Sequence, residues 1–291
     1  MNSSLTKGGR SNGYRVFAIV ILILLAIFFI FPLYWIITGS FKTAMAINAK
    51  VPQWFPLEPT LDNYLRLFKR PAMHWMLNTV VIAVAAMLLT CLTASLAGYA
   101  LAKKRFYGRK ILFTLLICAM ALPKQVIVIP LLQEMSNIPF YDFDYGEWAT
   151  MHDTLLAVIL PTVGWPFGVF LMKQFSETIP TEILEAARVD GAGEIRTFST
   201  IVFPMIKPGV GALAIFTFVN TWNDYFLQLI MLTSEESWTI SLGIARLQGE
   251  MASDFGLIMA GASLAAIPIV TIFLLFQKYF TQGITMGAVK G

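Results

Sequence analysis

The sequence is poor in charge and in cysteine, and each shortage excludes a class of protein. Only 13% of its 291 residues are charged and 57% are hydrophobic, against about 25% charged and roughly 45–50% apolar in an average globular domain. So little charge cannot cover the water-exposed surface of a chain of this length, and we expect a membrane protein. Cys91 and Cys118 both lie inside apolar runs, which argues against a disulfide framework and a zinc site and predicts packing roles for both.

The sequence also lacks the groups from which enzymes build their sites. Its two histidines, His74 and His152, sit at the edges of apolar segments without an HExxH pattern, so we expect no catalytic residue, no metal site and no cofactor. The phosphate-binding pattern G-x-x-x-x-G-K-[ST] does not occur, so ATP energy has to come from a partner. The basic residues form no stripe on a polar face, which argues against nucleic acid as a partner. Transport is the function class that remains.

Long apolar runs are what the sequence has in excess. A helix needs about 20 residues to cross the hydrocarbon core of a bilayer, and six runs meet this length. The predicted spans lie near residues 16–39, 77–102, 111–132, 155–173, 209–232 and 257–279. The predicted fold class is therefore all-α, a polytopic membrane protein with six transmembrane helices. Its expected parts are an N-terminal segment (1–15), the six-helix domain (16–279) and a C-terminal tail (280–291).

The distribution of the 21 Lys and Arg residues predicts the orientation. Fourteen precede the first span, lie at the C-terminal end (Lys278 and Lys290) or lie in the loops 103–110 and 173–208, whereas six lie in the three opposite loops. Because Lys and Arg gather on the cytoplasmic side, we expect both termini in the cytoplasm. The loop 40–76 holds five of the six opposing residues and argues against this orientation.

A short amphipathic helix is predicted within that loop, at 61–68. Its apolar side consists of Leu61, Tyr64, Leu65 and Phe68. The spacing of these residues is helical, and the helix could lie at the outer membrane interface or pack on the spans of its own chain.

The loop 181–208 has the pattern of two short helices joined by a turn. Thr181 is a candidate cap for the first helix, and Glu182 and Glu185 fall in its first turns, where the helix dipole favours acids. Gly191 supplies the turn, and we expect the second helical stretch to end at Pro204 and Pro208. Such a helix can dock in a groove of another protein, although many loops between spans contain short helices without that role.

The same loop resembles the EAA loop of ABC importer permeases. Glu185-Ala186-Ala187, Gly191 and Ile201-x-Phe203-Pro204 follow the spacing of EAA-x3-G-x9-I-x-L-P, with Phe203 in place of leucine. Further segments are similar to the carbohydrate-uptake, maltose-permease-like branch of that family. They are PLEPTLDNYLRLF at 56–68, Leu77-Asn78-Thr79, AGYALAKKRFYGRK at 97–110, Trp222-Asn223-Asp224 and FTQGITMGAVKG at 280–291.

The resemblance implies a type I ABC importer permease fold in the bacterial cytoplasmic (inner) membrane, crossed several times. It implies a second homologous permease in a heterodimer, two cytoplasmic ATPase subunits and an extracytoplasmic solute-binding protein that delivers a sugar or oligosaccharide. The residues implied in coupling to the ATPase are Glu185, Ala186, Ala187, Asp190, Gly191 and Pro204. The tail from Gln282 would reach toward the ATPases or be a frayed end, and the loop 233–256 resembles the external loop that contacts the binding protein.

Two charged residues fall inside the predicted spans, Lys124 in the third and Asp224 in the fifth. They lie about 20 Å and 22 Å from the starts of those spans at 1.5 Å per residue. Because an unpaired charge in the membrane is costly, we expect them to pair or to share a cavity. Pro123 and Pro130 predict a kink in the third span.

These charges and their neighbours form a candidate substrate path, since aromatic faces and amides hold sugars. The path residues are Lys124, Asn220, Trp222, Asn223, Asp224 and Tyr225. A hydrogen-bond cluster that only holds the helices together is an equal alternative. Lys124 could attract the carboxylate of an acidic saccharide, although a neutral sugar is the better expectation. The competing functions are a self-contained ion-coupled carrier or channel, which has no need of an EAA loop, and an ABC permease for a non-sugar solute.

Overall fold

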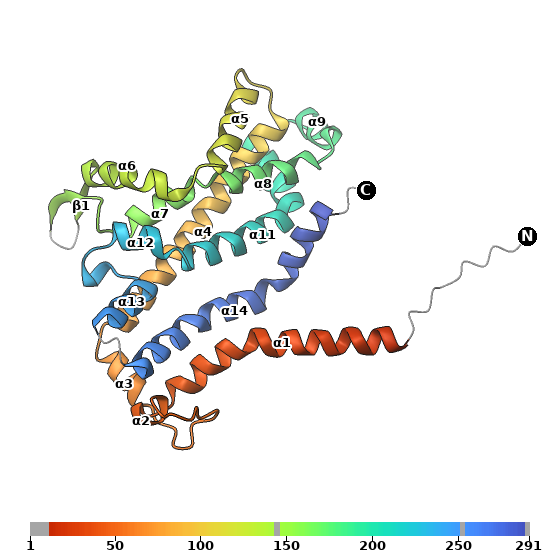
Figure 1. Ribbon diagram of the computed structural model, residues 1–291. Coiled ribbons are helices and arrows are strands. Elements are labelled where there is room, and N and C mark those ends of the chain that lie inside the picture. Colours follow the sequence, from red (N-terminus) through yellow and green to blue (C-terminus); the bar gives the residue numbers. More distant parts are fainter. Residues whose placement is uncertain (1–11, 143–145, 251–253, 289–291) are drawn as a thin grey trace, which may run out of the picture. The chain divides into compact units, whose positions relative to one another are not determined.

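The computed structural model describes residues 12–142, 146–250 and 254–288. The chain divides into two compact units, one of Met1–Arg70 with Glu250–Leu264 and one of Pro71–Gly249 with Ala265–Gly291. Helices dominate the described residues of both units, as the predicted fold class requires (Figure 1). The only sheet in this part of the chain is a hairpin of β1 (Pro139–Asp142) and β2 (Glu147–Thr150).

The smaller unit contains the first long helix and the segment that follows it. Its elements are α1 (Asn12–Ser40), α2 (Ala44–Ile47), α3 (Asp62–Phe68) and the first turns of α14 (Phe255–Ala288). The Asn63 amide donates to the carbonyl oxygens of Ser40 and Lys42, each at 2.9 Å, and thereby ties α3 to the end of α1. Gly39 faces Met259, because a Cβ at Gly39 would lie 2.1 Å from the sulfur of Met259.

Helix α3 confirms the predicted short helix but not the alternative in which its apolar side packs on its own spans. Leu61 and Leu65 are 61% and 62% exposed, and Phe68 is 47% exposed. The side chains of α3 that are buried are those of Asn63 and Leu67. Most of the apolar side that the sequence indicates is therefore open to lipid or to another protein.

The larger unit is built around α4 (Ala72–Lys103), which packs along α8 (Pro166–Glu177) and α11 (Phe203–Trp222). Gly98 permits the closest approach, since a Cβ at this position would lie 2.6 Å from the backbone nitrogen of Lys173 in α8. Cys91 is buried in this core, as expected, whereas Cys118 is exposed and does not pack within the chain. The remaining elements are α5 (Arg109–Met120), α6 (Lys124–Asn137), α7 (Leu156–Val163), α9 (Thr181–Val189), α10 (Glu194–Thr197), the π-helix η1 (Phe198–Val202), α12 (Tyr225–Met231), the 3-10 helix η2 (Glu235–Ser237) and α13 (Ile240–Glu250).

Five helical segments of the described residues are long and apolar enough to cross a membrane. They are Gly13–Ser40, Ala72–Lys103, Leu156–Glu177, Glu194–Trp222 and Phe255–Gln277. A sixth candidate, the predicted span at 111–132, is instead a pair of helices, α5 and α6, bent by 106°. Pro123 sits at this bend as the N-cap of α6, so the predicted kink is confirmed. Proline lacks the amide hydrogen that would continue the helix.

The fifth predicted span begins too late in the sequence. The helix that contains its first part runs from Glu194 to Trp222 and continues through Pro204 and Pro208, where the sequence predicted an end. The rest of the predicted span is the break at Asn223 and Asp224 and the short helix α12. The backbone changes to a π-helix at η1, in which the N–H of Phe203 donates to the carbonyl of Phe198. This wider turn immediately precedes Pro204, whose ring would otherwise clash with the preceding turn of an α-helix.

The last helix is longer than the sixth predicted span. Helix α14 continues to Ala288, whereas the span was placed at 257–279. Most of the predicted tail is therefore helical, which differs from a frayed end, and residues 289–291 lie outside the described part of the chain.

Candidate functional site

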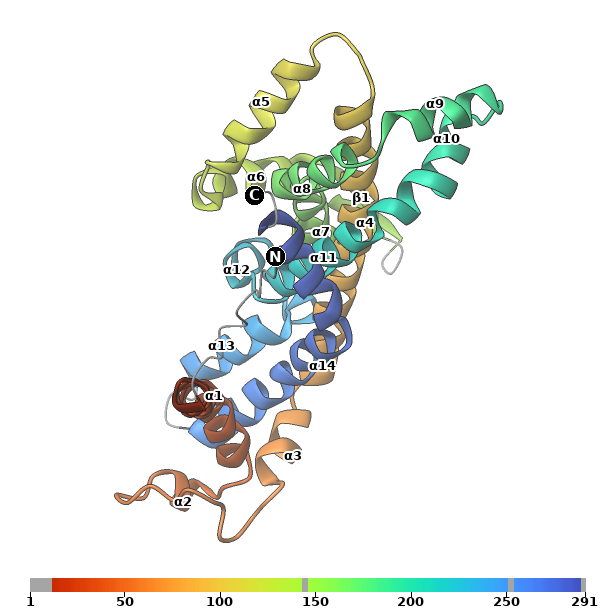
Figure 2. The same ribbon diagram turned by 90° about the vertical axis from the view of Figure 1, so that its right-hand side faces the viewer.

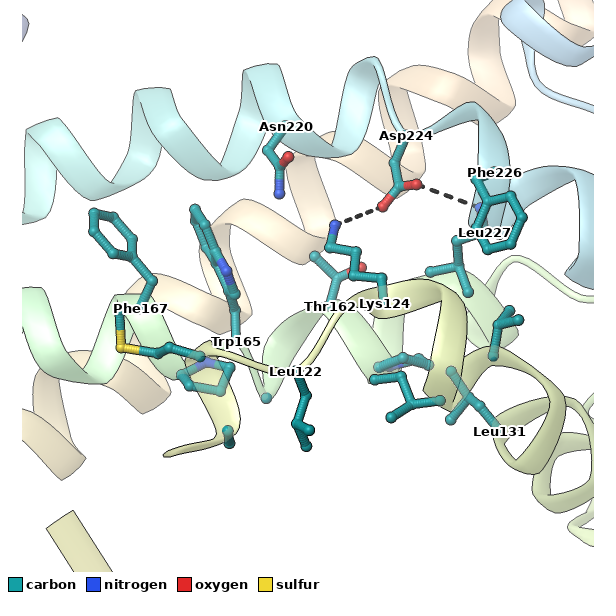
Figure 3. Close-up of a pocket in the computed structure, with 17 residues that line it drawn as sticks. Leu122, Lys124, Leu131, Thr162, Trp165, Phe167, Asn220, Asp224, Phe226 and Leu227 are labelled. Atoms are coloured by element: carbon teal, nitrogen blue, oxygen red, sulfur yellow. Dashed lines mark hydrogen bonds and ion pairs between the residues drawn. The ribbon is translucent and has the colours of Figure 1, made fainter. Parts of the chain in front are cut away.

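A pocket of about 530 Å³ lies where three interrupted helices of the larger unit meet (Figure 3). The interruptions are the α5–α6 bend, the α7–α8 break at Gly164 and Trp165, and the α11–α12 break at Asn223 and Asp224. Irregular backbone at membrane depth is tolerated where it is buried in protein or lines a cavity. The lining residues used below are Lys124, Thr162, Trp165, Phe167, Asn220 and Asp224.

Lys124 and Asp224 form an ion pair inside this pocket. The Lys124 ammonium donates to Oδ2 of Asp224 at 2.8 Å, which confirms the predicted pairing. The other carboxylate oxygen accepts from the backbone N–H of Leu227 at 3.3 Å and caps α12. The two side chains differ in access, since that of Lys124 is 52% exposed and that of Asp224 only 13%. Asp224 is thus held in place, while Lys124 reaches across to it.

The helix starts from which the depths of the two charges were counted differ in the structure. The depth of Asp224 was counted from a predicted span start at 209, but that helix starts at Glu194. The depth of Lys124 was counted along the third span, whereas the chain bends between α5 and α6 and Lys124 is the first residue of α6. The two charges meet because both lie at helix interruptions.

The structure brings three of the six predicted path residues to the pocket. Lys124, Asn220 and Asp224 line it, and the Asn220 side chain points into it (Figure 3). Trp222 is 1% exposed and stacks on Phe218 with ring centroids 5.4 Å apart. The Asn223 amide donates to the carbonyl of Val219 at 2.8 Å and thus binds the end of its own helix. Asn223 and Tyr225, like Trp222, are outside the lining.

Aromatic side chains from the α7–α8 break complete the lining, and they were not among the predicted path residues. The ring centroids of Trp165 and Phe167 are 5.0 Å apart. The Trp165 ring lies beside the polar groups of the pocket, and Phe167 lies on its far side (Figure 3). The signal was present in Pro161 and in Gly164-Trp165-Pro166, because proline and glycine within an apolar run mark a candidate break.

The N-terminal part of α4 holds the loop that follows α12. The Asn78 amide donates to the carbonyls of Glu236 at 2.7 Å and Trp238 at 3.0 Å. The hydroxyl of Thr79 accepts from the backbone N–H of Ile240 at 2.8 Å. These contacts explain why polar residues lie near the start of an otherwise apolar helix. Their side chains form hydrogen bonds with the backbone of an irregular segment, whose N–H and C=O groups have few partners within the segment.

Asp153 holds the same loop from its other side. It has a left-handed backbone, with φ of 63°, and its carboxylate accepts from the N–H groups of Thr233 at 2.7 Å and Ser234 at 3.1 Å. Burial alone would raise the pKa of Asp153, but the hydrogen bonds from Thr233 and Ser234 outweigh burial and hold the pKa below its usual value of 3.8. The ionised form is therefore the one that stabilises the folded loop.

We expect Asp153→Asn to destabilise the protein by about 1–3 kcal/mol, since a charged acceptor shared by two backbone N–H groups is replaced by a neutral one. Asparagine tolerates the left-handed backbone, so the loss of stability measures the contribution of the negative charge and not of backbone strain. Because the folded pKa is depressed, the stability supplied by Asp153 is present above pH 3.8 and is lost as the pH falls through the folded value. Thermal unfolding in nanodiscs between pH 3 and 7 measures this. Equal pH dependence of the wild type and the variant would contradict it.

Helices α9 and α10 form a hairpin that projects from α8 and α11 (Figure 2). Gly191, with φ of +76°, ends α9 as expected. The N–H of Ala192 donates to the carbonyl of Ala187 at 2.9 Å and that of Gly191 to Arg188 at 3.1 Å, which is the Schellman pattern. The predicted cap was wrong: Thr181 is the first residue of α9, and Pro180 occupies the N-cap without a side-chain bond.

The surface of this hairpin is polar along α9 and apolar at its tip. Glu185 and Ala186 are exposed, and Ala187 is buried against the hairpin. Val189 and Ile195 flank the turn and are each 87% exposed. Large apolar side chains at a tip that projects from the protein are typical of a contact with another protein.

Two lysines at the end of α4 hold the hairpin, one at its base and one at the start of α10. Lys103 donates to the carbonyls of Ile179 at 2.5 Å and Glu177 at 3.2 Å, and Lys104 forms an ion pair with Glu194. Burial acts to lower the pKa of Lys104, but Glu194 and Tyr99 outweigh burial and raise it above its usual value. The hairpin is therefore attached to the end of α4 by both lysines.

Comparisons with known proteins agree with this architecture. Residues 92–286 match the family described as "Binding-protein-dependent transport system inner membrane component". The arabinooligosaccharide permease AraQ of Bacillus subtilis (strain 168) is 31% identical over 96% of each chain. The maltodextrin permease MdxG of the same organism is 34% identical over 95% of this chain and 96% of its own. In a crystal structure of a bacterial ABC transporter that imports the acidic polysaccharide alginate, one chain is 21% identical with a TM-score of 0.76, over 93% of this chain and 98% of that one.

Proposed function

Because the chain belongs to the family of binding-protein-dependent transport system inner membrane components, we propose that it is the permease subunit of an ATP-driven saccharide importer. Membership makes it a multi-pass protein of the inner membrane and a transport subunit rather than an enzyme. The finer proposal is that an extracytoplasmic binding protein delivers a sugar or oligosaccharide and that this chain, with a second homologous permease, passes it to the cytoplasm. Two separate ATPase subunits supply the energy.

The projecting α9–α10 hairpin is the observation that carries the proposal. Its exposed Glu185 and Ala186, its Gly191 turn and its apolar tip offer a surface to a groove in an ATPase. An ion-coupled carrier working alone has no use for such a surface. Among the described lining residues of the pocket, a single ion pair is also too little for a proton relay, which uses several titratable groups.

The hairpin can transmit motion because its base is tied to two long helices. Lys103 and Lys104 attach it to α4, and η1 continues α10 into α11 without a break. Helix α11 ends at Asn223 and Asp224 beside the pocket. When ATP binding moves the docked hairpins, α4 and α11 move with them and bias the permease between two states. Lys124, Asn220 and Asp224 then line part of the substrate path.

The orientation follows from the same proposal. Both termini and the α9–α10 hairpin lie in the cytoplasm, where the ATPases are, and the loop held by Asn78 and Asp153 lies outside. That loop, the predicted contact of the binding protein, is rigidly attached to α4, so the docked binding protein and the ATPases act on the same helix from its two ends. The first 15 residues and the end of α14 are cytoplasmic on this view.

We expect the reconstituted importer to retain ATPase activity that a loaded binding protein stimulates. Val189→Glu should lower both ATPase retention and stimulated hydrolysis at least about tenfold, because it puts a charge into an apolar contact. Val51→Glu is the matched control, since Val51 is 77% exposed in a loop after α1 and belongs to the other side of the membrane. The measurements are co-purification of the ATPase and hydrolysis in proteoliposomes. If no ATPase is retained by the wild type, or if Val189→Glu equals Val51→Glu, the proposal fails.

A further inference from the structure

The pocket at the helix interruptions has two opposite charges and no net charge. Among its described lining residues, Lys124 and Asp224 are the only titratable side chains, and they are bound to one another at 2.8 Å. We propose that this pocket binds a neutral saccharide and discriminates against acidic ones, with the ion pair as the element that determines specificity. The inference rests on the proposed import of a saccharide and names its chemical class.

The geometry of the pair disfavours an anionic ligand. Asp224 is fixed by its bond to the Leu227 N–H, so a ligand carboxylate near Lys124 meets a like charge that cannot turn away. A like charge placed opposite a ligand charge is unfavourable, and the Asp224 side chain is only 13% exposed, so water screens it little. To capture a carboxylate, Lys124 would have to leave Asp224 and strand that recessed side chain without its counter-ion.

A neutral saccharide finds complementary groups in the same place. An ammonium has three donor hydrogens and a carboxylate about four acceptor sites, so both members keep capacity for hydroxyl groups after they have paired. Among the described residues, Asn220 has no hydrogen-bond partner for its side-chain amide, and it points into the pocket beside Trp165 (Figure 3). The amide can donate to one hydroxyl and accept from another.

The aromatic side supplies the apolar half of the recognition. Trp165 presents its ring next to these polar groups, with Phe167 on its far side, and the C–H face of a sugar ring packs on such surfaces while its hydroxyls remain at the rim. A volume of about 530 Å³ falls within the roughly 300–1,000 Å³ of small-molecule sites. The pocket therefore has an apolar wall, a free amide and a paired charge.

The test is direct binding to the assembled importer in nanodiscs without the binding protein, so that the pocket alone sets the preference. The probes are radiolabelled maltotriose, which is neutral, and trigalacturonate, which has the same number of rings and three carboxylates. Asp224→Asn is the informative variant, because asparagine can still cap α12 while Lys124 loses its counter-ion. Lys173→Gln with Glu177→Gln removes an ion pair of α8 outside the pocket and serves as the matched control.

The wild type should bind maltotriose at least about tenfold more tightly than trigalacturonate. Asp224→Asn should shift this ratio toward trigalacturonate by about tenfold or more, and adding Lys124→Met should remove the gain. The control pair should leave the ratio unchanged. Equal binding of the two probes to the wild type, an unchanged ratio in Asp224→Asn, or no binding of either probe overturns the inference. Uptake that depends on a binding protein would still uphold the proposed function in each of these cases.

Discussion

Gly191→Pro should abolish saccharide uptake, with a loss of at least about 100-fold, while the protein still inserts in the membrane. Gly191 has φ of +76°, whereas proline is fixed near −65°. Proline also removes the N–H that donates to Arg188 and disfavours the helical backbone of Asp190 before it. The turn that joins α9 to α10 therefore cannot form, and the surface that we propose for docking to the ATPase is lost.

Two milder variants distinguish an effect of the Gly191 turn on uptake from a general effect of substitution in the loop. The Cβ of Gly191→Ala would meet no atom within 4 Å. The left-handed backbone at this position costs about 1 kcal/mol or more for a residue with a Cβ, so we expect a partial loss of uptake. Gly193→Ala also enters open space and has an ordinary φ of −70°, so it should transport normally. Uptake in proteoliposomes and the amount of protein in the membrane are the two measurements. Normal uptake by Gly191→Pro would remove the coupling role of the hairpin.

Gly98→Val should prevent assembly of a stable protein, with a destabilisation of about 3 kcal/mol or more. A Cβ at Gly98 would lie 2.6 Å from the nitrogen of Lys173 and 2.7 Å from the carbonyl carbon of Met172. These are backbone atoms and cannot turn aside, so α4 and α8 have to separate. Small residues at helix interfaces allow this kind of close approach in membrane proteins.

A second glycine of the same unit provides the comparison. Gly164→Ala places its Cβ 3.8 Å from the carbonyl oxygen of Pro161, an ordinary contact distance, and should leave stability nearly unchanged. The yield of monodisperse protein and its midpoint of thermal unfolding in nanodiscs distinguish the two variants. A Gly98→Val protein with the midpoint of the wild type would show that α4 and α8 do not need this approach.

The long helices were predictable from the sequence because an apolar run of about 20 residues is typical of a membrane-spanning helix. The breaks at Gly164 and at Asn223 were not predicted, because hydropathy is averaged over a window and remains high across a break. Trp165 and Phe167 lie at such a break. Because aromatic residues make up 13% of the chain, the presence of two of them in an apolar run did not indicate a site. The π-helix η1 was also hidden, since its five residues are too few to change the periodicity.

The candidate site was predictable in its charges and not in its other members. Lys124 and Asp224 are rare charges in apolar surroundings, and the cost of leaving either unpaired was enough to predict their contact. Trp222 and Asn223 were judged by residue type, but their roles depend on the direction of each side chain. Trp222 faces Phe218 and Asn223 its own helix, and the three-dimensional position of the α11–α12 break decides both directions.

The number of residues in the π-helix η1 determines the direction in which the hairpin projects. An α-helix advances about 100° per residue, and a π-turn accommodates one residue more than an α-turn. The side chains of α10 are consequently rotated about the helix axis by about 100°, the angle of one residue, relative to an α-helix that continued from α11 without η1. Removal of one residue within Phe198–Val202 would turn Glu194 away from Lys104 and change the direction in which the hairpin presents its proposed docking surface.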